Sequence, residues 1–372
     1  MIRRYGFLLI GLSIIFNAMS WSSETNPPTL KIGASAPDFT LPGVDGKTYS
    51  LKDFAGAKYL MIIFTCNHCP TAQAYENRIK QLVADYKNKG VAFVAISPND
   101  PLAVRLDELG YTDLSDSFDE MKIRAKQREY NYPYLYDGET QKTALAYGPT
   151  ATPHVFLFDA ERKLRYTGRI DDSEQEARVK VKDTRNALDA LLAGKPAPVE
   201  TTKTFGCSIK WAEKRESAKQ SLQKWAAEPV ACEPINEENL KALVKNNSNK
   251  LRLINIWATW CGPCMVEFPE LVTINRMYRN RAFEFIAVSA DEPDFQGKVL
   301  TALQKNEASN KNYHFNSTDK YKLIEAVDSK WPGALPHTLL VRPGGEIVYR
   351  QTGEIDPLEL KRAIVKNLAE DR

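Results

Sequence analysis

The chain has 372 residues, of which 43% are hydrophobic and 26% are charged, and this composition excludes a disordered or fibrous protein. At ~100–200 residues per domain, its length corresponds to about two domains. The formal net charge is +3, with both signs interspersed and no basic stripe with interleaved aromatic residues, so a nucleic-acid partner is not expected.

The N-terminus has the pattern of a targeting segment. Arg3 and Arg4 precede an apolar run at 6–16, and small residues around Ala18 resemble a cleavage site. The run is shorter than the ~20 residues that span a bilayer. We therefore expect a signal peptide over residues 1–22, with an uncleaved N-terminal anchor as the alternative. The protein would then be exported to the periplasm or a similar compartment, where disulfides persist.

The first half of the mature chain alternates strand and helix patterns after a lead-in that ends in a small hairpin at 44–47. Continuous apolar runs predict buried strands, and helical spacing of apolar residues predicts the helices. Ser117 and Glu120 have the spacing of an N-terminal helix cap. The expected elements are strand 58–65, helix 70–90, strand 91–97, helix 116–130, strands 154–159 and 163–168, and helix 176–194.

The second half repeats this order after an additional first helix. The expected elements are helix 237–247, strand 251–258, helix 263–280, strand 283–290, helix 294–306, a hairpin over 337–350, and helix 357–370. The repetition predicts a tandem duplication of one α/β fold, each copy with a central mixed sheet flanked by helices. We place the two domains at 31–200 and 236–372, joined by a linker at 201–235 that contains a solvated helix.

Four of the six cysteines form two Cys-x-x-Cys pairs, Cys66 with Cys69 and Cys261 with Cys264. Each pair falls between a buried strand and the next helix, which places it at the carboxyl edge of a sheet and at a helix N-terminus. There, unpaired N–H groups stabilise the thiolate of the first cysteine, and the second cysteine can attack a mixed disulfide. The spacing therefore predicts Cys66 and Cys261 as nucleophiles.

The segment WATWCGPCMVEFP at 257–269 resembles the TlpA/ResA-like reductants of the thioredoxin superfamily, and the resemblance extends over 236–368. It implies a thioredoxin-like fold and four site residues: Cys261 as nucleophile, Cys264 as resolving thiol, Glu267 as an aid to proton transfer, and Pro336 as a cis-proline opposite the pair. For Glu267 the alternative is a structural ion pair with a neighbouring lysine.

The segment FTCNHCP at 64–70 resembles the redoxin or AhpC/TSA-like branch of the same superfamily, over 31–212, and implies Pro153 as the cis-proline. Peroxiredoxins use Pro-x-x-x-Thr-x-x-Cys, whereas here Thr65 directly precedes Cys66. We therefore expect disulfide exchange, with a peroxidase-type antioxidant activity as the alternative. An imidazole between the cysteines, as in Dsb-type oxidants, predicts a more oxidising pair than Cys-Gly-Pro-Cys.

Metal binding and the remaining cysteines leave other possibilities open. Two Cys-x-x-Cys pairs could form a four-thiolate zinc site. Copper chaperones of the Sco type share the fold, and Cys69-Pro70 with His154 resembles their ligand set; His337 is the equivalent in the second half. Cys207 and Cys232 flank the linker and could form a structural disulfide, resolve the first pair, or remain free thiols.

The sequence thus predicts an exported thiol–disulfide oxidoreductase that exchanges disulfides with protein partners through mixed disulfides. The mechanism needs no bound cofactor or metal. By family analogy, its electrons would come from a membrane thiol carrier.

Overall fold

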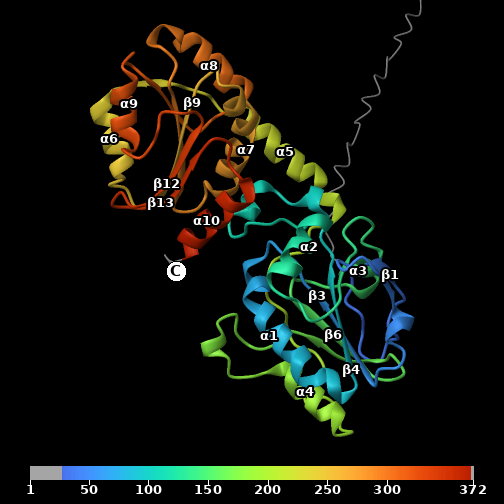
Figure 1. The fold of residues 1–372 in the computed structure, drawn as a ribbon. Helices are drawn as coiled ribbons and strands as arrows, with labels where there is room; N and C mark the ends of the chain where they lie inside the picture. The colour runs from blue at the N-terminus through green and yellow to red at the C-terminus, as the bar shows by residue number, and fades with distance from the viewer. Residues whose placement is uncertain (1–26, 370–372) are drawn as a thin grey trace, which may run out of the picture.

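The computed structural model describes residues 27–369, so the predicted signal peptide lies outside the described residues. Two mixed sheets, each flanked by helices, form the protein (Figure 1). The strand order is β5-β4-β3-β6-β7 in the first sheet and β13-β12-β9-β10-β11-β8 in the second. We call the parts around these sheets the N-terminal and C-terminal domains. The predicted α/β class, with two tandem folds, is confirmed.

The N-terminal domain contains the elements predicted for the first half together with short ones that were missed. Its strands are β1 (Thr40–Pro42), β2 (Thr48–Ser50), β3 (Tyr59–Phe64), β4 (Val91–Ser97), β5 (Tyr134–Tyr136), β6 (His154–Phe158) and β7 (Leu164–Gly168). Its helices are α1 (Pro70–Tyr86), α2 (Phe118–Gln127), α3 (Lys142–Tyr147) and α4 (Asp183–Leu192). The helix predicted over 176–194 begins only at Asp183, because residues 176–178 form a separate 3-10 turn.

The C-terminal domain follows the linker helix α5 (Arg215–Ala226). Its strands are β8 (Glu233–Ile235), β9 (Leu251–Trp257), β10 (Phe283–Ser289), β11 (Lys311–Phe315), β12 (His337–Val341) and β13 (Ile347–Thr352). Its helices are α6 (Glu237–Lys245), α7 (Gly262–Tyr278), α8 (Gln296–Lys305), α9 (Lys320–Val327) and α10 (Pro357–Ala369).

The central strand of each domain is buried along its whole length, which explains its continuous apolar sequence. Alternate side chains of a strand point to opposite faces of the sheet. In β3, Tyr59, Met61 and Ile63 therefore join one apolar cluster, while Leu60 and Phe64 join another on the opposite face. Burial of each such side chain stabilises the fold by roughly 1.5–3 kcal/mol. Helices and loops cover both faces, so the next turn of chain, which carries the cysteines, starts from a rigid support.

The loop after β4 forms a packing contact between the two domains. It contains the 3-10 turn η4 (Leu106–Leu109), which packs against α7. Val104 and Leu109 belong to the same apolar cluster as Met277 of the C-terminal domain. The Tyr278 hydroxyl donates to the Thr112 carbonyl at 2.7 Å. In Figure 1, the C-terminal domain (yellow to red) therefore rests on the N-terminal domain (blue to green), with α5 between them.

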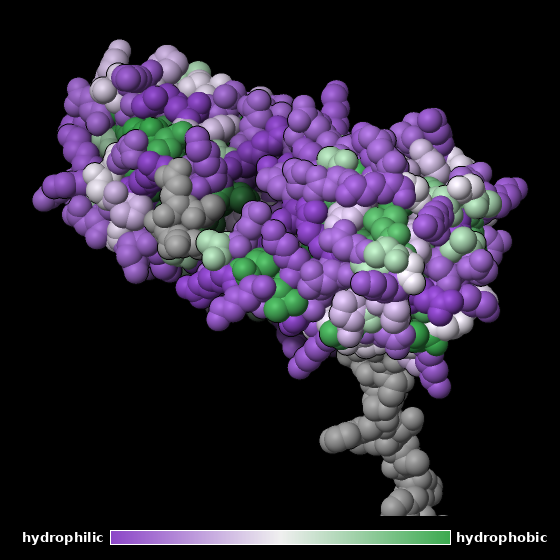
Figure 2. Space-filling model, turned by 90° about the horizontal axis from the view of Figure 1, so that it is seen from below, coloured by the Kyte–Doolittle hydropathy of each residue, from purple (hydrophilic) through white to green (hydrophobic). Residues whose placement is uncertain are grey.

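The surface seen in Figure 2 is largely hydrophilic, and its hydrophobic residues form small, separate patches. None of the helices within residues 27–369 combines the length and apolar character that a membrane crossing would require.

Candidate active sites

The cysteine pair of the C-terminal domain caps the N-terminus of α7. Cys261 is the N-cap residue, and its sulfur accepts the Cys264 N–H at 3.2 Å. The two sulfurs form a disulfide. The Leu335–Pro336 peptide bond is cis. Both cysteines are buried, whereas the neighbouring Trp260 is 67% exposed. The geometry presents a disulfide at a helix N-terminus next to an exposed aromatic side chain.

Glu267 lies buried one turn beyond the pair. Its carboxylate accepts the Ile355 N–H at 2.9 Å and the Asn255 side-chain amide at 3.0 Å. Among the described residues, the partners of Glu267 are thus neutral amides, and the alternative of an ion pair with a lysine is not found. Burial raises the pKa of Glu267 to about 7, although these two hydrogen bonds act in the opposite direction. A carboxyl group that titrates near neutral pH is suited to proton transfer.

Glu267→Gln is expected to remove a pH dependence of stability. The pKa of Glu267 is about 7 in the folded protein, whereas a carboxyl group in the unfolded chain has a pKa of 4.5. Between these pH values the folded state therefore holds one more proton than the unfolded state. Stability of the wild type therefore falls as pH rises through this window, by on the order of 2 kcal/mol. Urea unfolding of both chains at pH 5 and pH 8 measures this difference. Glu270→Gln, on the same helix, is the control, and equal pH dependence in wild type and Glu267→Gln would contradict the prediction.

In the N-terminal domain the second cysteine of the pair, not the first, lies at the helix N-terminus. Helix α1 begins at Pro70, so Cys69 is its N-cap, and the Cys69 sulfur accepts the Ala72 N–H at 3.4 Å. Cys66 lies three residues before the cap, and the expectation that it occupies the helix N-terminus is wrong. The reason is Pro70, since proline lacks an N–H and its fixed φ suits the first helical position.

Strand register shows which cysteine of the N-terminal domain corresponds to Cys261 of the C-terminal domain. His154, after the cis peptide bond of Pro153, pairs with Phe64, and His337 pairs with Ile256. Cys69 is five residues after Phe64, and Cys261 is five residues after Ile256. Cys69 therefore corresponds to Cys261. Cys66 occupies the position three residues before this cysteine, which is threonine in the peroxiredoxin motif.

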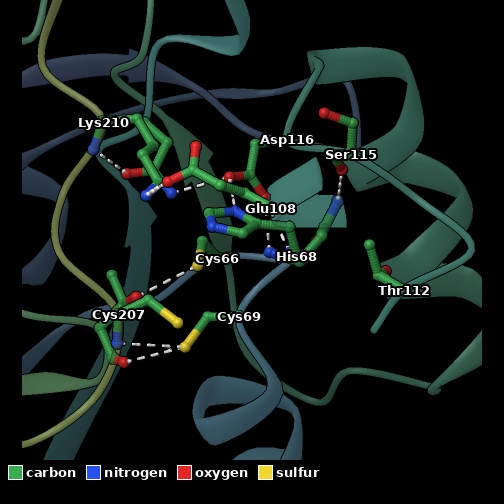
Figure 3. A network of polar contacts seen from close by, with 12 residues as sticks. Cys66, His68, Cys69, Glu108, Thr112, Ser115, Asp116, Cys207 and Lys210 are labelled. Atoms are coloured by element: carbon green, nitrogen blue, oxygen red, sulfur yellow. Dashed lines mark hydrogen bonds and ion pairs between the residues drawn. The ribbon is translucent and has the colours of Figure 1, made fainter. Parts of the chain in front are cut away.

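Asp116 holds the turn between the two cysteines in a non-helical conformation (Figure 3). One carboxylate oxygen accepts the N–H groups of Asn67 and His68 at 2.8 and 3.1 Å. The other oxygen contacts His68 Nδ1 at 2.5 Å and accepts the Asn99 side-chain amide at 2.7 Å. Asp116 is fully buried and His68 nearly so. The prediction from sequence missed Asp116, which is 48 residues from His68.

His68 and Asp116 each favour the charged form of the other. Burial by itself disfavours the imidazolium, but the charge and hydrogen bond of Asp116 outweigh it and raise the pKa of His68. Burial would likewise favour the neutral carboxyl, but the charge and hydrogen bond of His68 outweigh it and lower the pKa of Asp116. The imidazole that the sequence places beside the thiols therefore lies next to a carboxylate that favours its protonated form.

The two thiols of this pair lie in opposite environments. Burial raises the pKa of Cys66, whose sulfur is 3.2 Å from the Thr152 hydroxyl. Hydrogen bonds from the thiols of Cys207 and Cys66, and from the N–H groups of Ala72 and Cys207, lower the pKa of Cys69. Cys69, rather than Cys66, is therefore the cysteine whose thiolate the structure stabilises.

The donors near this site are poorly suited to a metal ion. Donor atoms of Cys66, His68 and Asp116 lie within 4.8 Å of one another. However, both oxygens of Asp116 already accept hydrogen bonds. His154, the candidate copper ligand, accepts the Thr150 N–H at 3.1 Å with one ring nitrogen and contacts the Thr167 hydroxyl at 3.0 Å with the other. Burial lowers its pKa to about 4.

His337 and the remaining cysteine differ from the site residues in their surroundings. The His337 ring stacks on Trp331 with 4.9 Å between ring centroids, and Nδ1 lies 2.9 Å from the Thr352 hydroxyl. Burial lowers the pKa of His337 to about 4. Cys232 is a free, half-buried thiol packed against the core of the C-terminal domain. Cys207, in contrast, lies at the Cys66–Cys69 site.

Comparison with known proteins identifies one family model and several relatives that match this chain. The Redoxin family model matches residues 31–188 and 210–367. The chain is 29% identical over 170 residues to the thiol-disulfide oxidoreductase ResA of Bacillus thuringiensis subsp. konkukian, which covers 44% of this chain and 86% of that protein. ResA of Bacillus thuringiensis strain Al Hakam is 30% identical over 118 residues, 32% of this chain. The chain spans only 63% of the length of that relative.

Two solved structures are also similar. A hypothetical protein from Sinorhizobium meliloti 1021 is 33% identical, covering 50% of this chain and 97% of its own, with a TM-score of 0.44. An uncharacterized conserved protein from Geobacillus kaustophilus is 40% identical, covering 49% of this chain and 92% of its own, with a TM-score of 0.43.

The fold and the cysteine geometry are those of the thioredoxin superfamily, and the chain is similar to thiol-disulfide oxidoreductases over part of its length. Because the family model matches most of its length, in two tandem regions, the chain belongs to the Redoxin family.

Proposed function

We propose that the protein is exported and exchanges disulfides with protein partners through two sites, Cys66–Cys69 and Cys261–Cys264. The observation that carries the proposal is shared by both sites: a cysteine that caps a helix, a second cysteine three positions away, and a cis-proline loop at the neighbouring strand. The predicted signal peptide supports an extracytoplasmic location, where a membrane thiol carrier would supply electrons.

At the C-terminal site, the capping sulfur of Cys261 is the one that exchanges with the partner. A thiolate is the reactive form, and the Cys264 N–H at 3.2 Å stabilises it. Cys264, which is fully buried, then attacks the mixed disulfide and releases the partner. Glu267, one helical turn beyond Cys264 and with a pKa of about 7, would accept or return the proton of this step. Exposed Trp260 and Val266 flank the pair and offer an apolar contact to the partner chain.

Helix α7 has the C-terminal site at one end and a contact with the N-terminal domain at the other. The N-terminal domain contacts α7 near its last turn, at Tyr278, while Cys261 caps the first turn. At ~1.5 Å per residue, the 17 residues of α7 separate these ends by about 25 Å. Sulfur atoms must touch to exchange a disulfide, and we therefore propose that each site serves its own partner.

A disulfide-reduction assay tests the C-terminal site. In a full-length chain with Cys66, Cys69 and Cys207 replaced by serine, insulin reduction driven by dithiothreitol reports this site alone. Cys261→Ser is expected to lower the rate at least a hundredfold, because no other cysteine caps the helix. Cys232→Ser is the matched control and should leave the rate within twofold. A Cys261→Ser chain as active as its parent would disprove the assignment.

The two pairs are expected to differ in reduction potential. Stabilisation of the reduced thiolate makes a disulfide more oxidising. The Cys69 sulfur accepts the N–H groups of Ala72 and Cys207, whereas the Cys261 sulfur accepts that of Cys264. Titration of each site against glutathione, with the other site replaced by serine, measures this. A higher potential at the N-terminal site supports the proposal of distinct roles, while equal potentials contradict it. Copper that copurifies stoichiometrically and is lost in Cys66→Ser would instead favour metal handling.

A further inference from the structure

A third cysteine lies against the N-terminal pair. The Cys207 N–H donates to the Cys69 sulfur at 3.3 Å, and the Cys207 side chain packs against the Cys66–Cys69 pair. Figure 3 shows the side chain of Cys207 directed toward Cys69 from a separate segment of chain. The two residues are 138 positions apart, so the tertiary fold, not local sequence, brings them together.

We propose that Cys207 is a second disulfide partner of Cys69, so that Cys69 is shared between two alternative disulfides, one with Cys66 and one with Cys207. The proposal rests on the proposed disulfide-exchange function of this site and adds the residue through which partners reach it.

The segment around Cys207 is fixed in place on both sides. Before it, Gly206 lies so close to the Thr152 carbonyl that an added Cβ would be 2.0 Å from that oxygen. Cys207 itself pairs with Thr152, whose N–H donates to the Cys207 carbonyl at 3.0 Å. After it, Ile209 and Trp211 are buried in the domain core. A segment held this firmly presents its cysteine to Cys69 in a constant position.

Lys210 adds a polar anchor next to this cysteine. Its N–H donates to the Asn99 side chain at 2.9 Å, and its ammonium contacts Glu108 at 2.6 Å. Asn99 also donates to Asp116, so the segment of Cys207 and the turn of Cys66–Cys69 share a hydrogen-bond network. The three sulfurs therefore belong to one rigid arrangement.

Exposure distinguishes the three sulfurs. Cys69 is fully buried and Cys66 is 3% exposed, whereas Cys207 is half-buried. A partner protein can therefore approach Cys207 more readily than either member of the Cys-x-x-Cys pair. Cys69, as the helix cap, is the better leaving group, since a thiolate of low pKa leaves faster.

Exchange with a partner proceeds through two thiolate attacks. In the oxidised centre, a thiolate of the partner attacks Cys207 Sγ, a bond forms between these sulfurs, and the Cys69–Cys207 bond breaks. Its electron pair remains on Cys69 as the thiolate. A second thiolate of the partner attacks the partner sulfur of the mixed disulfide and releases Cys207, which takes a proton. The partner's dithiol loses two electrons to the centre, and its second proton passes to water.

Disulfide mapping of the full-length chain tests the proposal. Cys232, Cys261 and Cys264 are replaced by serine, and the reduced chain is oxidised with glutathione disulfide, blocked in acid and digested with trypsin. Cys66 and Cys69 fall in the peptide 59–78 and Cys207 in the peptide 204–210, so a Cys207 disulfide joins two peptides. In the Cys66→Ser variant, this cross-link is expected in most molecules. In Cys69→Ser, it should fall at least tenfold.

A second readout is the rate at which reduced glutathione opens the oxidised centre. Loss of the exposed sulfur in Cys207→Ser should slow this rate at least tenfold. The proposal is overturned if Cys66→Ser shows no cross-link while Cys207→Ser still forms the Cys66–Cys69 disulfide, and in that case the proposed function stands. If the chain with all three thiols forms no disulfide, the proposed function of this site fails as well.

Discussion

Replacing Asp116 with alanine is expected to destabilise the N-terminal domain by about 3–5 kcal/mol, because the change breaks a buried carboxylate–imidazole pair and leaves His68 without its partner. Asp116 has no exposed surface and receives four hydrogen bonds from the turn and from Asn99. Without them, the N–H groups of Asn67 and His68 would be unsatisfied in the interior. Urea unfolding followed by the reactivity of Cys66 and Cys69 toward a maleimide reports on this domain specifically.

The pH dependence identifies the ion pair as the cause. The lowered pKa of Asp116 gives a contribution that is present above 3.8 and is lost as pH falls through its folded value. The raised pKa of His68 gives a contribution that is present below 6.5 and is lost as pH rises through its folded value. The difference between wild type and Asp116→Ala should therefore be largest between about pH 4 and 6.5. Asp119→Ala, an exposed carboxylate nearby, is the control, and a loss below 1 kcal/mol in Asp116→Ala would contradict the argument.

The sequence was sufficient for the parts of the fold that local patterns determine. The central strands β3 and β9 are uninterrupted apolar runs because both of their faces are covered, and their burial confirms the prediction. The Ser117 cap of α2 was also predicted correctly, since its hydroxyl accepts the Glu120 N–H. The short strands β5, β8 and β11 were missed. Three to five residues carry too little periodicity, and pairing with a neighbouring strand determines them.

The site was only partly predictable. The start of α1 could have been found, since a proline directly after Cys69 is typical of the first helical position, and this places Cys69 rather than Cys66 at the cap. Asp116 and Cys207 could not be placed, because contacts of 48 and 138 residues of separation arise from tertiary packing. The sequence therefore indicates the chemistry of the cysteines, while the fold determines which sulfur is stabilised.

Gly206→Ala is expected to displace the segment of Cys207 from Cys69. At φ +141° a side chain is strained, and its Cβ would lie 2.0 Å from the Thr152 carbonyl oxygen, which belongs to the backbone and cannot turn aside. The domain should lose about 2–3 kcal/mol of stability, and Cys69 should become accessible. In a Cys66→Ser background, the rate of Cys69 alkylation, read from the peptide 59–78, should rise at least tenfold.

Gly194→Ala separates this clash from the general cost of a side chain at positive φ. Gly194 has φ +74°, but nothing lies within 4 Å of an added Cβ, so the substitution should cost only about 1 kcal/mol and leave Cys69 protected. Similar alkylation rates in the two variants would mean that the segment does not shield Cys69. A selective rise in Gly206→Ala would instead show that one backbone contact at Thr152 controls both the exposure of Cys69 and its access to Cys207.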